Sequence, residues 1–173
     1  PFDQPGLSKT LAGVRDSKQM TPRQRHALVE RIQSTALTWG VGSASSAEID
    51  EMGIVPAVKL AMRRALEIAL AKAEFAPSCL FLDALLWPEM VQIPQVSLIG
   101  GDARSLSIAA ASVLAKVWRD EYMTDLDKDL PQYGFAEHKG YGTARHQAAL
   151  ETYGPSPIHR MTFAPIKKII HSR

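Results

Sequence analysis

The sequence predicts an α/β fold in which helices surround a small sheet. Two short apolar runs, residues 79–82 (CLFL) and 96–99 (VSLI), have the length and composition of buried strands. Stretches with the apolar spacing of amphipathic helices lie on either side of these runs. Helices interleaved with strands are typical of α/β layer architectures. The 173 residues, 46% of them apolar and 22% charged, correspond to about one globular domain.

The N-terminal part of the chain is predicted to contain a loop, a helix and a strand. Residues 1–20 are polar and interrupted by proline and glycine, which favours a loop. Thr21 and Gln24 form a capping-box pattern around a proline at the first helical position, and they predict a helix that ends near Ala36. Residues 37–44 (LTWGVGSA) are expected to form a further strand.

Helices are predicted through most of the remaining chain. Ser45 and Glu48 form a second capping-box pattern, which predicts a short helix. The apolar positions of residues 56–72 and of the alanine-rich residues 105–127 follow helical spacing. After a glycine-containing loop, residues 143–153 form the next predicted helix, which is followed by a proline-rich turn and a short basic helix.

The charge is nearly balanced over the whole chain but is concentrated at its C-terminal end. Twenty Lys and Arg face 18 Asp and Glu, a net charge of +2. Residues 138–173 contain six Lys or Arg and one acid, Glu151, so this segment carries +5 and the preceding residues carry −3. A basic end on a mildly acidic body indicates an anionic partner such as nucleic acid. A solvated surface with a basic tail is the alternative interpretation.

The single cysteine, Cys79, excludes a disulfide framework and favours a reducing compartment. No run approaches the roughly 20 apolar residues of a membrane span, so no membrane partner is expected. Together with the balanced charge, these features predict a cytoplasmic protein that is a monomer.

Two aspartates follow the two predicted strands. Asp83 comes directly after residues 79–82, and Asp102 follows two glycines after residues 96–99. Because strand ends in α/β sheets face the crevice where ligands bind, both carboxylates are expected at one point. Like charges held close together favour a cation, and hard oxygen ligands suit Mg²⁺ or Mn²⁺ acting on a phosphodiester. Alternatively, Asp102 caps the following helix and Asp83 begins a turn.

Two smaller groups of polar side chains are candidates for phosphate contacts. Ser112, Lys116 and Asp120 are spaced by four residues and therefore share one face of the helix predicted over 105–127. The serine and lysine could hold a phosphate while Asp120 supports a metal site, although an ordinary Lys–Asp pair on a helix explains the same spacing. Ser17 and Lys18 offer a hydroxyl and an ammonium before a helix start, or ordinary turn chemistry.

The glycine-rich segment 138–143 (HKGYGT) has the composition of a nucleic-acid contact. Lys139 supplies positive charge for phosphate, and Tyr141 supplies a flat ring for stacking on a sugar or base. The glycines on either side of Tyr141 leave the backbone room to approach a ligand. The alternative is a glycine-rich turn in which Tyr141 packs on the core.

Three familiar kinds of site are not expected. The serine-hydrolase elbow G-x-S-x-G and the phosphate loop G-x-x-x-x-G-K-[ST] are absent from the sequence. A zinc site is not expected either, because the C-terminal histidines are irregularly spaced and the cysteine lies in a strand pattern. The histidines considered are His138, His146 and His159.

Six blocks, taken in order, resemble ribonuclease HII, the type 2 ribonuclease H family. They are DSKQM (16–20), EID (48–50), FLDA (81–84), GGDARSLSIAAASVLAKVWRDEYM (100–123), HKGYGT (138–143) and PIHRMTF (157–163). The resemblance spans nearly the whole chain. It implies a ribonuclease H-like mixed sheet flanked by helices, with residues 1–128 as the core. Residues 129–173 would form a substrate-contacting loop and a small helical C-terminal part of the same domain.

The resemblance also implies an endoribonuclease that cuts RNA in RNA–DNA hybrids and nicks duplex DNA on the 5′ side of embedded ribonucleotides. Members of the family hold two divalent ions, Mg²⁺ or Mn²⁺, with four carboxylates. By resemblance, Asp83 and Asp102 bind metal and, with Asp120, act in catalysis. Nucleic-acid contacts are expected from Tyr141, which stacks on a sugar, and from Lys139, Lys18, Ser17, Ser112 and Lys116.

The chain departs from the family pattern at three places. Gly100 stands where the family usually has lysine, and Ala84 stands where it usually has glycine. The opening motif Asp-Glu-Ala-Gly-Arg-Gly, which carries two carboxylates and the central strand hairpin, is absent. We therefore expect residues upstream, or another chain, to supply these carboxylates, without which the chain would be inactive. The alternative is a catalytically silent nucleic-acid-binding module derived from the same fold.

Overall fold

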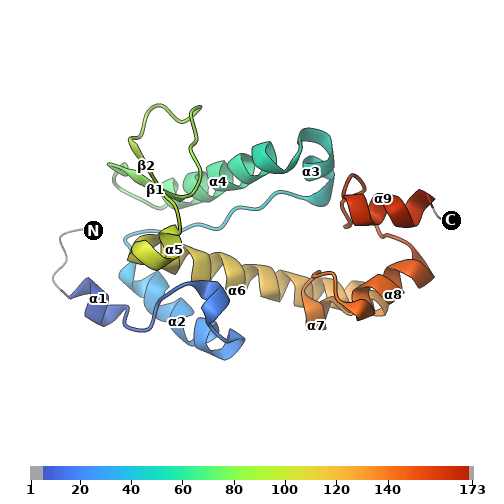
Figure 1. Cartoon of the computed structure of the whole chain (residues 1–173). Coiled ribbons are helices and arrows are strands. Elements are labelled where there is room, and N and C mark those ends of the chain that lie inside the picture. Colours follow the sequence, from blue (N-terminus) through green and yellow to red (C-terminus); the bar gives the residue numbers. More distant parts are fainter. Residues whose placement is uncertain (1–5, 172–173) are drawn as a thin grey trace. The chain divides into compact units, whose positions relative to one another are not determined.

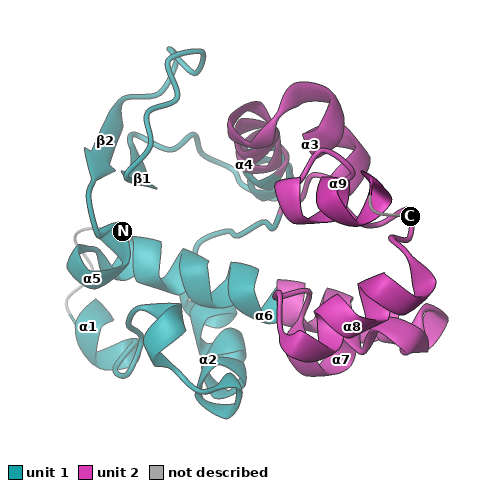
Figure 2. Ribbon diagram, turned by 45° about the vertical axis from the view of Figure 1, so that its right-hand side comes forward, with its two compact units in different colours: residues 1–41, 65–118 teal, residues 42–64, 119–173 magenta. Residues whose placement is uncertain are grey.

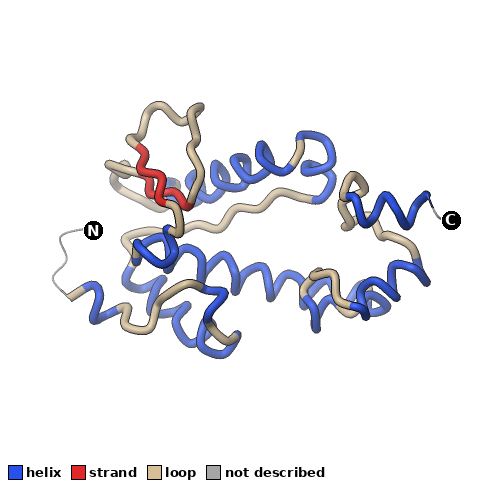
Figure 3. Tube along the Cα trace, in the orientation of Figure 1, coloured by secondary structure: helices blue, strands red, loops and turns tan. Residues whose placement is uncertain are grey.

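The structure is a computed structural model that describes residues 6–171. It is mostly helical and has a small sheet, as Figures 1 and 3 show, so the predicted α/β class is confirmed. The elements, in chain order, are α1 (Leu7–Thr10), η1 (Ser17–Gln19), α2 (Pro22–Thr35), α3 (Ser46–Met52), α4 (Ile54–Leu70), β1 (Leu80–Asp83), β2 (Gln95–Leu98), α5 (Gly101–Arg104), α6 (Leu106–Asp129), η2 (Pro131–Tyr133), α7 (Phe135–His138), α8 (Ala144–Tyr153) and α9 (Ala164–His171).

The chain divides into two compact units, which are coloured separately in Figure 2. Unit 1 is formed by the chain up to residue 41 and by residues 65–118, and unit 2 by residues 42–64 and the chain from residue 119 onward. Helices α4 and α6 each contribute residues to both units. The division expected at residue 128 stays a prediction.

The sheet in unit 1 consists of the two predicted strands. Strands β1 and β2 are parallel, and their register pairs Leu80 with Gln95 and Asp83 with Leu98. The side chain of Gln95 holds the connection between them, since it accepts a hydrogen bond from the Trp87 amide and donates to the Trp87 carbonyl. Because the strands are parallel and end in register, Asp83 and the residues that follow Leu98 lie at the same edge of the sheet.

The strand predicted over residues 37–44 is wrong. Within the described residues the sheet contains β1 and β2 alone, and residues 38–45 are extended without strand pairing. The segment packs instead on α4, where the Thr38 hydroxyl donates to the Ala69 carbonyl at 2.7 Å. A side chain at Gly40 would lie 2.3 Å from the Ala65 carbonyl oxygen. The apolar residues and glycines of this segment therefore allow it to pack closely on α4, and they do not make it a strand.

The loop predicted over residues 1–20 is only partly correct. Its first five residues lie outside the described part of the chain, and α1 and η1 occupy much of the remainder. Both predicted capping boxes are confirmed, since Thr21 accepts from the Gln24 amide and Ser45 accepts from the Glu48 amide. Each cap satisfies a backbone N–H that has no partner within its own helix.

Helix α6 provides much of the core of unit 1. Its apolar face packs against residues of α2 and of the segment before it, and Val113 at the centre is fully buried. The cluster contains Leu11, Met20, Leu28, Ile32, Ala110, Val113, Leu114 and Val117. This packing holds the segment with η1 against the first half of α6. Among the described residues, no helix combines the length and the apolar character that a membrane crossing requires.

Candidate functional site

Asp83 and Asp102 come together at the end of the sheet, as the sequence predicts. Asp83 is the last residue of β1, and its Oδ1 accepts a hydrogen bond of 2.8 Å from the Gly101 amide at the start of α5. Asp102 is the next residue of that helix. This hydrogen bond connects the end of β1 to the start of α5 through Asp83 Oδ1. The other carboxylate oxygen, Oδ2, is left available for another ligand.

Gly101 makes the close approach of Asp83 possible. An added Cβ would lie 2.6 Å from Ile108 Cδ1 and 3.3 Å from Asp83 Oδ1. A larger residue would therefore force the end of the Ile108 side chain to move and Asp83 to give way by a few tenths of an ångström. Gly100 precedes it in the left-handed backbone region with a φ of 64°. This turn between β2 and α5 therefore depends on two glycines.

Lys18 lies beside Asp102 in unit 1, and the adjacent Ser17 contacts Ser112. The Lys18 Nζ is 3.6 Å from Asp102 Oδ2; the lysine side chain is 79% exposed and that of the aspartate 12%. The Ser17 and Ser112 hydroxyls form a hydrogen bond of 2.6 Å that links η1 to α6. The buried Arg25 guanidinium donates to the carbonyls of Ser17 and Met20. Lys18 thus faces the Asp102 carboxylate, and its neighbour Ser17 is tied to Ser112.

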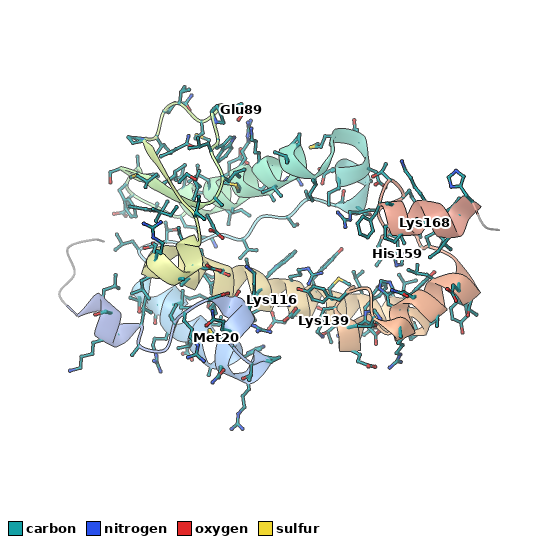
Figure 4. All side chains as sticks on the ribbon, in the orientation of Figure 1. Met20, Glu89, Lys116, Lys139, His159 and Lys168 are labelled. Atoms are coloured by element: carbon teal, nitrogen blue, oxygen red, sulfur yellow. The ribbon has the colours of Figure 1, made fainter. Side chains whose placement is uncertain are left out.

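Lys116 and Asp120 continue along α6. They are four residues apart and lie on one face of this helix, where Figure 4 labels Lys116. The backbone carbonyl of Asp120 accepts a hydrogen bond from the Thr124 hydroxyl. The assignment of Lys116 to phosphate and of Asp120 to catalysis stays a prediction.

Tyr141 is exposed on a loop of unit 2 between α7 and α8. Its side chain lies over the Arg119 guanidinium, with 5.1 Å between the guanidinium carbon and the ring centroid. Lys139 has a left-handed backbone with a φ of 52°, and its ammonium, labelled in Figure 4, donates to Thr124 and to the Ala136 carbonyl. The aromatic ring is therefore presented to solvent, whereas the lysine ammonium is held by the protein.

Three buried histidines lie together behind this loop, although sequence spacing did not group them. The Nε2 atoms of His146 and His159 are 3.1 Å apart, and the rings of His138 and His146 stack at 4.5 Å. Burial lowers the pKa of both His146 and His159. In residues 6–171, no group of three or more His, Cys, Asp or Glu could hold a metal ion. The concentration of histidines after residue 137 was the sequence signal for this cluster.

The EID and PIHRMTF blocks meet within unit 2. The Asp50 carboxylate accepts hydrogen bonds from the Thr162 hydroxyl and from the amides of Thr162 and Met161, and these bonds lower its pKa. Glu48 pairs with Arg64 at 2.6 Å, and the guanidinium lowers the pKa of Glu48 to about 2. Both carboxylates hold backbone segments in place, so their role in the structure is that of anchors.

Comparison with known proteins identifies the family. A family model described as Ribonuclease HII matches residues 5–166. The chain belongs to the ribonuclease HII family. The motif blocks at Asp83, Asp102 and Tyr141 all lie inside the matched region.

Curated relatives named Ribonuclease HII agree with this membership. The chain is 51% identical to the protein from Roseiflexus castenholzii over 159 residues, which cover 90% of this chain and 67% of the relative. It is 50% identical to the protein from Desulfitobacterium hafniense (strain DSM 10664 / DCB-2), with 91% and 59% covered, and 52% identical to that from Chloroflexus aurantiacus, with 95% and 74% covered. The chain thus spans about three fifths to three quarters of the length of these relatives.

A solved structure agrees with the fold. The crystal structure of the ribonuclease H2 from Pyrococcus horikoshii OT3 superposes with a TM-score of 0.68, covering 96% of this chain and 85% of the other. At 23% identity this likeness concerns the fold alone. It agrees with the ribonuclease H-like architecture predicted for the chain.

We predict that Ala84→Gly raises the free energy of unfolding by about 1 kcal/mol, because Ala84 has a φ of 50° that strains an L-residue. Its amide donates to the Leu98 carbonyl at 2.9 Å, so the turn cannot relax without losing this bond. Urea unfolding measures the change. The control Ala111→Gly, on the exposed side of α6, should lower stability by about 1 kcal/mol. A loss of stability in Ala84→Gly would contradict the assignment of strain.

The buried histidines predict a pH dependence of stability. Burial lowers the pKa of His146 and His159 in the folded state, so the unfolded state binds more protons as the pH falls below the ordinary value of 6.5. The free energy of unfolding should be highest above about pH 7 and decrease progressively below about pH 6.5. Urea unfolding between pH 5 and 8 measures it. Replacing the exposed His26 by glutamine should leave the decrease in place, and a flat profile in the parent protein would contradict the prediction.

Proposed function

We propose that the protein is a metal-dependent endoribonuclease that cuts RNA in RNA–DNA hybrids and nicks duplex DNA on the 5′ side of embedded ribonucleotides. The observation that carries the proposal is the contact between Asp83 and the Gly101 amide, which brings Asp83 next to Asp102 at the end of the sheet. Membership of the ribonuclease HII family supports the same reaction.

The carboxylate pair suits Mg²⁺ or Mn²⁺. Mg²⁺ usually keeps several waters and binds through one or two carboxylates together with substrate phosphates, so two aspartates are a sufficient protein contribution for one ion. Asp83 would offer Oδ2, and Asp102 would offer the oxygens that now face Lys18. When bound, divalent ions activate water and stabilise the leaving oxygen of a phosphodiester. Asp120 is assigned a supporting role near this site, by the family resemblance.

Lys18, Ser17 and Ser112 are assigned to the phosphate backbone. The exposed Lys18 ammonium already lies 3.6 Å from Asp102 Oδ2, so a phosphate bound next to that carboxylate would come within reach of Lys18. Lys18 would thereby supply a positive charge beside the metal site, where this chain has Gly100 instead of the usual lysine. Lys116 and Lys139 complete the set of proposed backbone contacts.

Tyr141 is assigned to the sugar next to the ribonucleotide. Its ring is exposed, and glycines on either side leave the backbone open to a close approach. Stacking of an aromatic ring on a sugar, with backbone groups near the 2′-OH, is a common way to distinguish RNA from DNA. We further propose that the protein acts in the cytoplasm as a monomer, in keeping with its balanced charge and lone cysteine.

The second candidate is a catalytically silent nucleic-acid-binding module derived from the same fold. The basic C-terminal segment supports binding in either case. The two candidates differ in one observable property: the enzyme cuts when Mg²⁺ or Mn²⁺ is added, whereas the binding module shows salt-sensitive binding without cleavage under any metal.

Asp83→Asn should abolish metal-dependent nicking by the intact protein at a single ribonucleotide in duplex DNA, because the amide removes a negatively charged ligand. A gel assay of strand cleavage with Mg²⁺ and with Mn²⁺ measures it. The matched control, Asp125→Asn, removes an exposed carboxylate that pairs with Lys128 and should leave the rate unchanged. Cleavage by Asp83→Asn at the normal rate would refute the carboxylate assignment. Binding without cleavage by the unaltered protein would favour the silent module.

A further inference from the structure

The buried histidines of unit 2 form a hydrogen-bonded relay with a defined direction. The Ser156 amide and hydroxyl lie 3.0 and 2.9 Å from His159 Nδ1, closer than the Ser156 carbonyl oxygen at 3.3 Å. Both closer groups can donate to Nδ1, so a neutral His159 carries its proton on Nε2. That Nε2 is 3.1 Å from His146 Nε2, which must then accept. His146 therefore carries its proton on Nδ1, and this atom is 3.1 Å from the Tyr141 carbonyl. The relay ends on the peptide group of the exposed tyrosine.

His138 holds the other side of the same loop. The Gly140 amide donates to His138 Nδ1 at 3.2 Å, which leaves the proton of a neutral imidazole on Nε2. His138 Nε2 lies 2.7 Å from the Tyr133 carbonyl, to which it donates. Its ring stacks on that of His146, with an angle of 14° between the planes. The Gly140 amide and the Tyr141 carbonyl are thus both held by imidazole nitrogens, the first by His138 and the second by His146.

The relay is protected from water and surrounded by aromatic rings. His138, His146 and His159 are 6%, 6% and 8% exposed. Phe135 contacts all three rings, with centroid separations between 5.5 and 5.9 Å. A second proton, on His146 Nε2, would set one N–H donor against the N–H of His159 Nε2, so the hydrogen bond between these two atoms needs His146 to be neutral. Such a fully satisfied buried network favours a single arrangement of the loop.

Arg119 connects the loop backbone to the tyrosine ring. Its Nη2 donates to the Lys139 carbonyl at 2.9 Å, while its guanidinium lies under the Tyr141 ring. A shift of the loop would therefore move the Tyr141 ring relative to the Arg119 guanidinium. The position of the exposed ring depends on where the buried imidazoles hold the peptide groups.

We propose that His146, oriented by His159, is a positioning residue that fixes Tyr141 for its contact with the ribonucleotide-containing strand. The inference rests on the proposed function, because it assumes that Tyr141 contacts the substrate. His146 acts through the Tyr141 carbonyl and does not itself reach the nucleic acid.

Two substitutions at residue 146 separate positioning from packing. In His146→Asn, the amide nitrogen lies near the place of the lost Nδ1 and can still donate to the Tyr141 carbonyl. In His146→Gln, the amide lies near the place of Nε2 and reaches toward His159 instead. We expect nicking of a single-ribonucleotide duplex to fall about fivefold to tenfold further in His146→Gln than in His146→Asn, the effect of one hydrogen bond. Equal losses in the two variants would overturn the proposal.

A double variant distinguishes failure of this inference from failure of the proposed function. Because His146 acts through Tyr141, His146→Gln should cause no further loss in a Tyr141→Ala background. A further loss of the same size there would overturn the proposal. If Tyr141→Ala itself cuts as fast as the unaltered protein, the proposed substrate contact of Tyr141 is wrong, and the positioning role for the substrate falls with it.

Nitrogen-15 NMR of the imidazole rings tests the relay independently of activity. The expected tautomers carry the proton on Nε2 in His138, on Nδ1 in His146 and on Nε2 in His159. In His159→Gln, His146 should no longer carry its proton on Nδ1 alone and should populate both tautomers. The Gly140 and Gly142 amide signals should shift as well. A His146 with its proton on Nε2 would overturn the inference whatever the cleavage assays show.

Discussion

The hydrogen bond from the Gly101 amide to Asp83 Oδ1 is the interaction on which the candidate metal site depends. It depends on parallel strands that end in register, on the room that Gly101 leaves beside Asp83, and on α6, whose Ile108 side chain lies next to Gly101. Each requirement is met by a different part of unit 1. Because one oxygen of Asp83 is used in this way, the carboxylate has a fixed orientation before any cation binds, which lowers the entropic cost of binding.

The proposed nucleic-acid contact at Tyr141 depends on different interactions from those of the metal site. Tyr141 lies on a glycine-rich loop, which by itself would populate many conformations. The structure limits this freedom from the interior, through imidazole nitrogens of His138 and His146 that hold the Gly140 amide and the Tyr141 carbonyl. Hydrogen bonds made in a dry environment are stronger than those on the surface, so a short exposed loop gains a definite position.

Local sequence signals were sufficient for much of the fold. The capping boxes at Thr21 and Ser45, the two apolar strands and the long alanine-rich helix depend on neighbouring residues, and the structure has all of them. The segment around Gly40 has strand-like composition, but its conformation is decided by contact with α4, some 25 residues further along the chain. The N-terminal turn of α5 and the left-handed backbone of Ala84 likewise depend on how two strands meet.

In the candidate site, too, some features could be predicted from the sequence and others depend on contacts between distant residues. Asp83 and Asp102 could be predicted because strand ends in such sheets converge, and the resemblance of six blocks to one family supported the assignment. The histidines could not be grouped from the sequence, because His138, His146 and His159 are separated by intervals that match no metal motif. Their association depends on the packing of α7, α8 and the turn at Ser156 around Phe135.

The central claim is that Asp83 and Asp102 form a divalent-cation site. Anomalous scattering at the manganese edge, from crystals of the intact protein grown with Mn²⁺, tests it most directly. The account predicts a manganese peak in contact with oxygens of both aspartates, at about 2 Å from each, while Asp83 Oδ1 keeps its hydrogen bond to the Gly101 amide. Manganese bound elsewhere, with these two carboxylates still facing Gly101 and Lys18 alone, would contradict it.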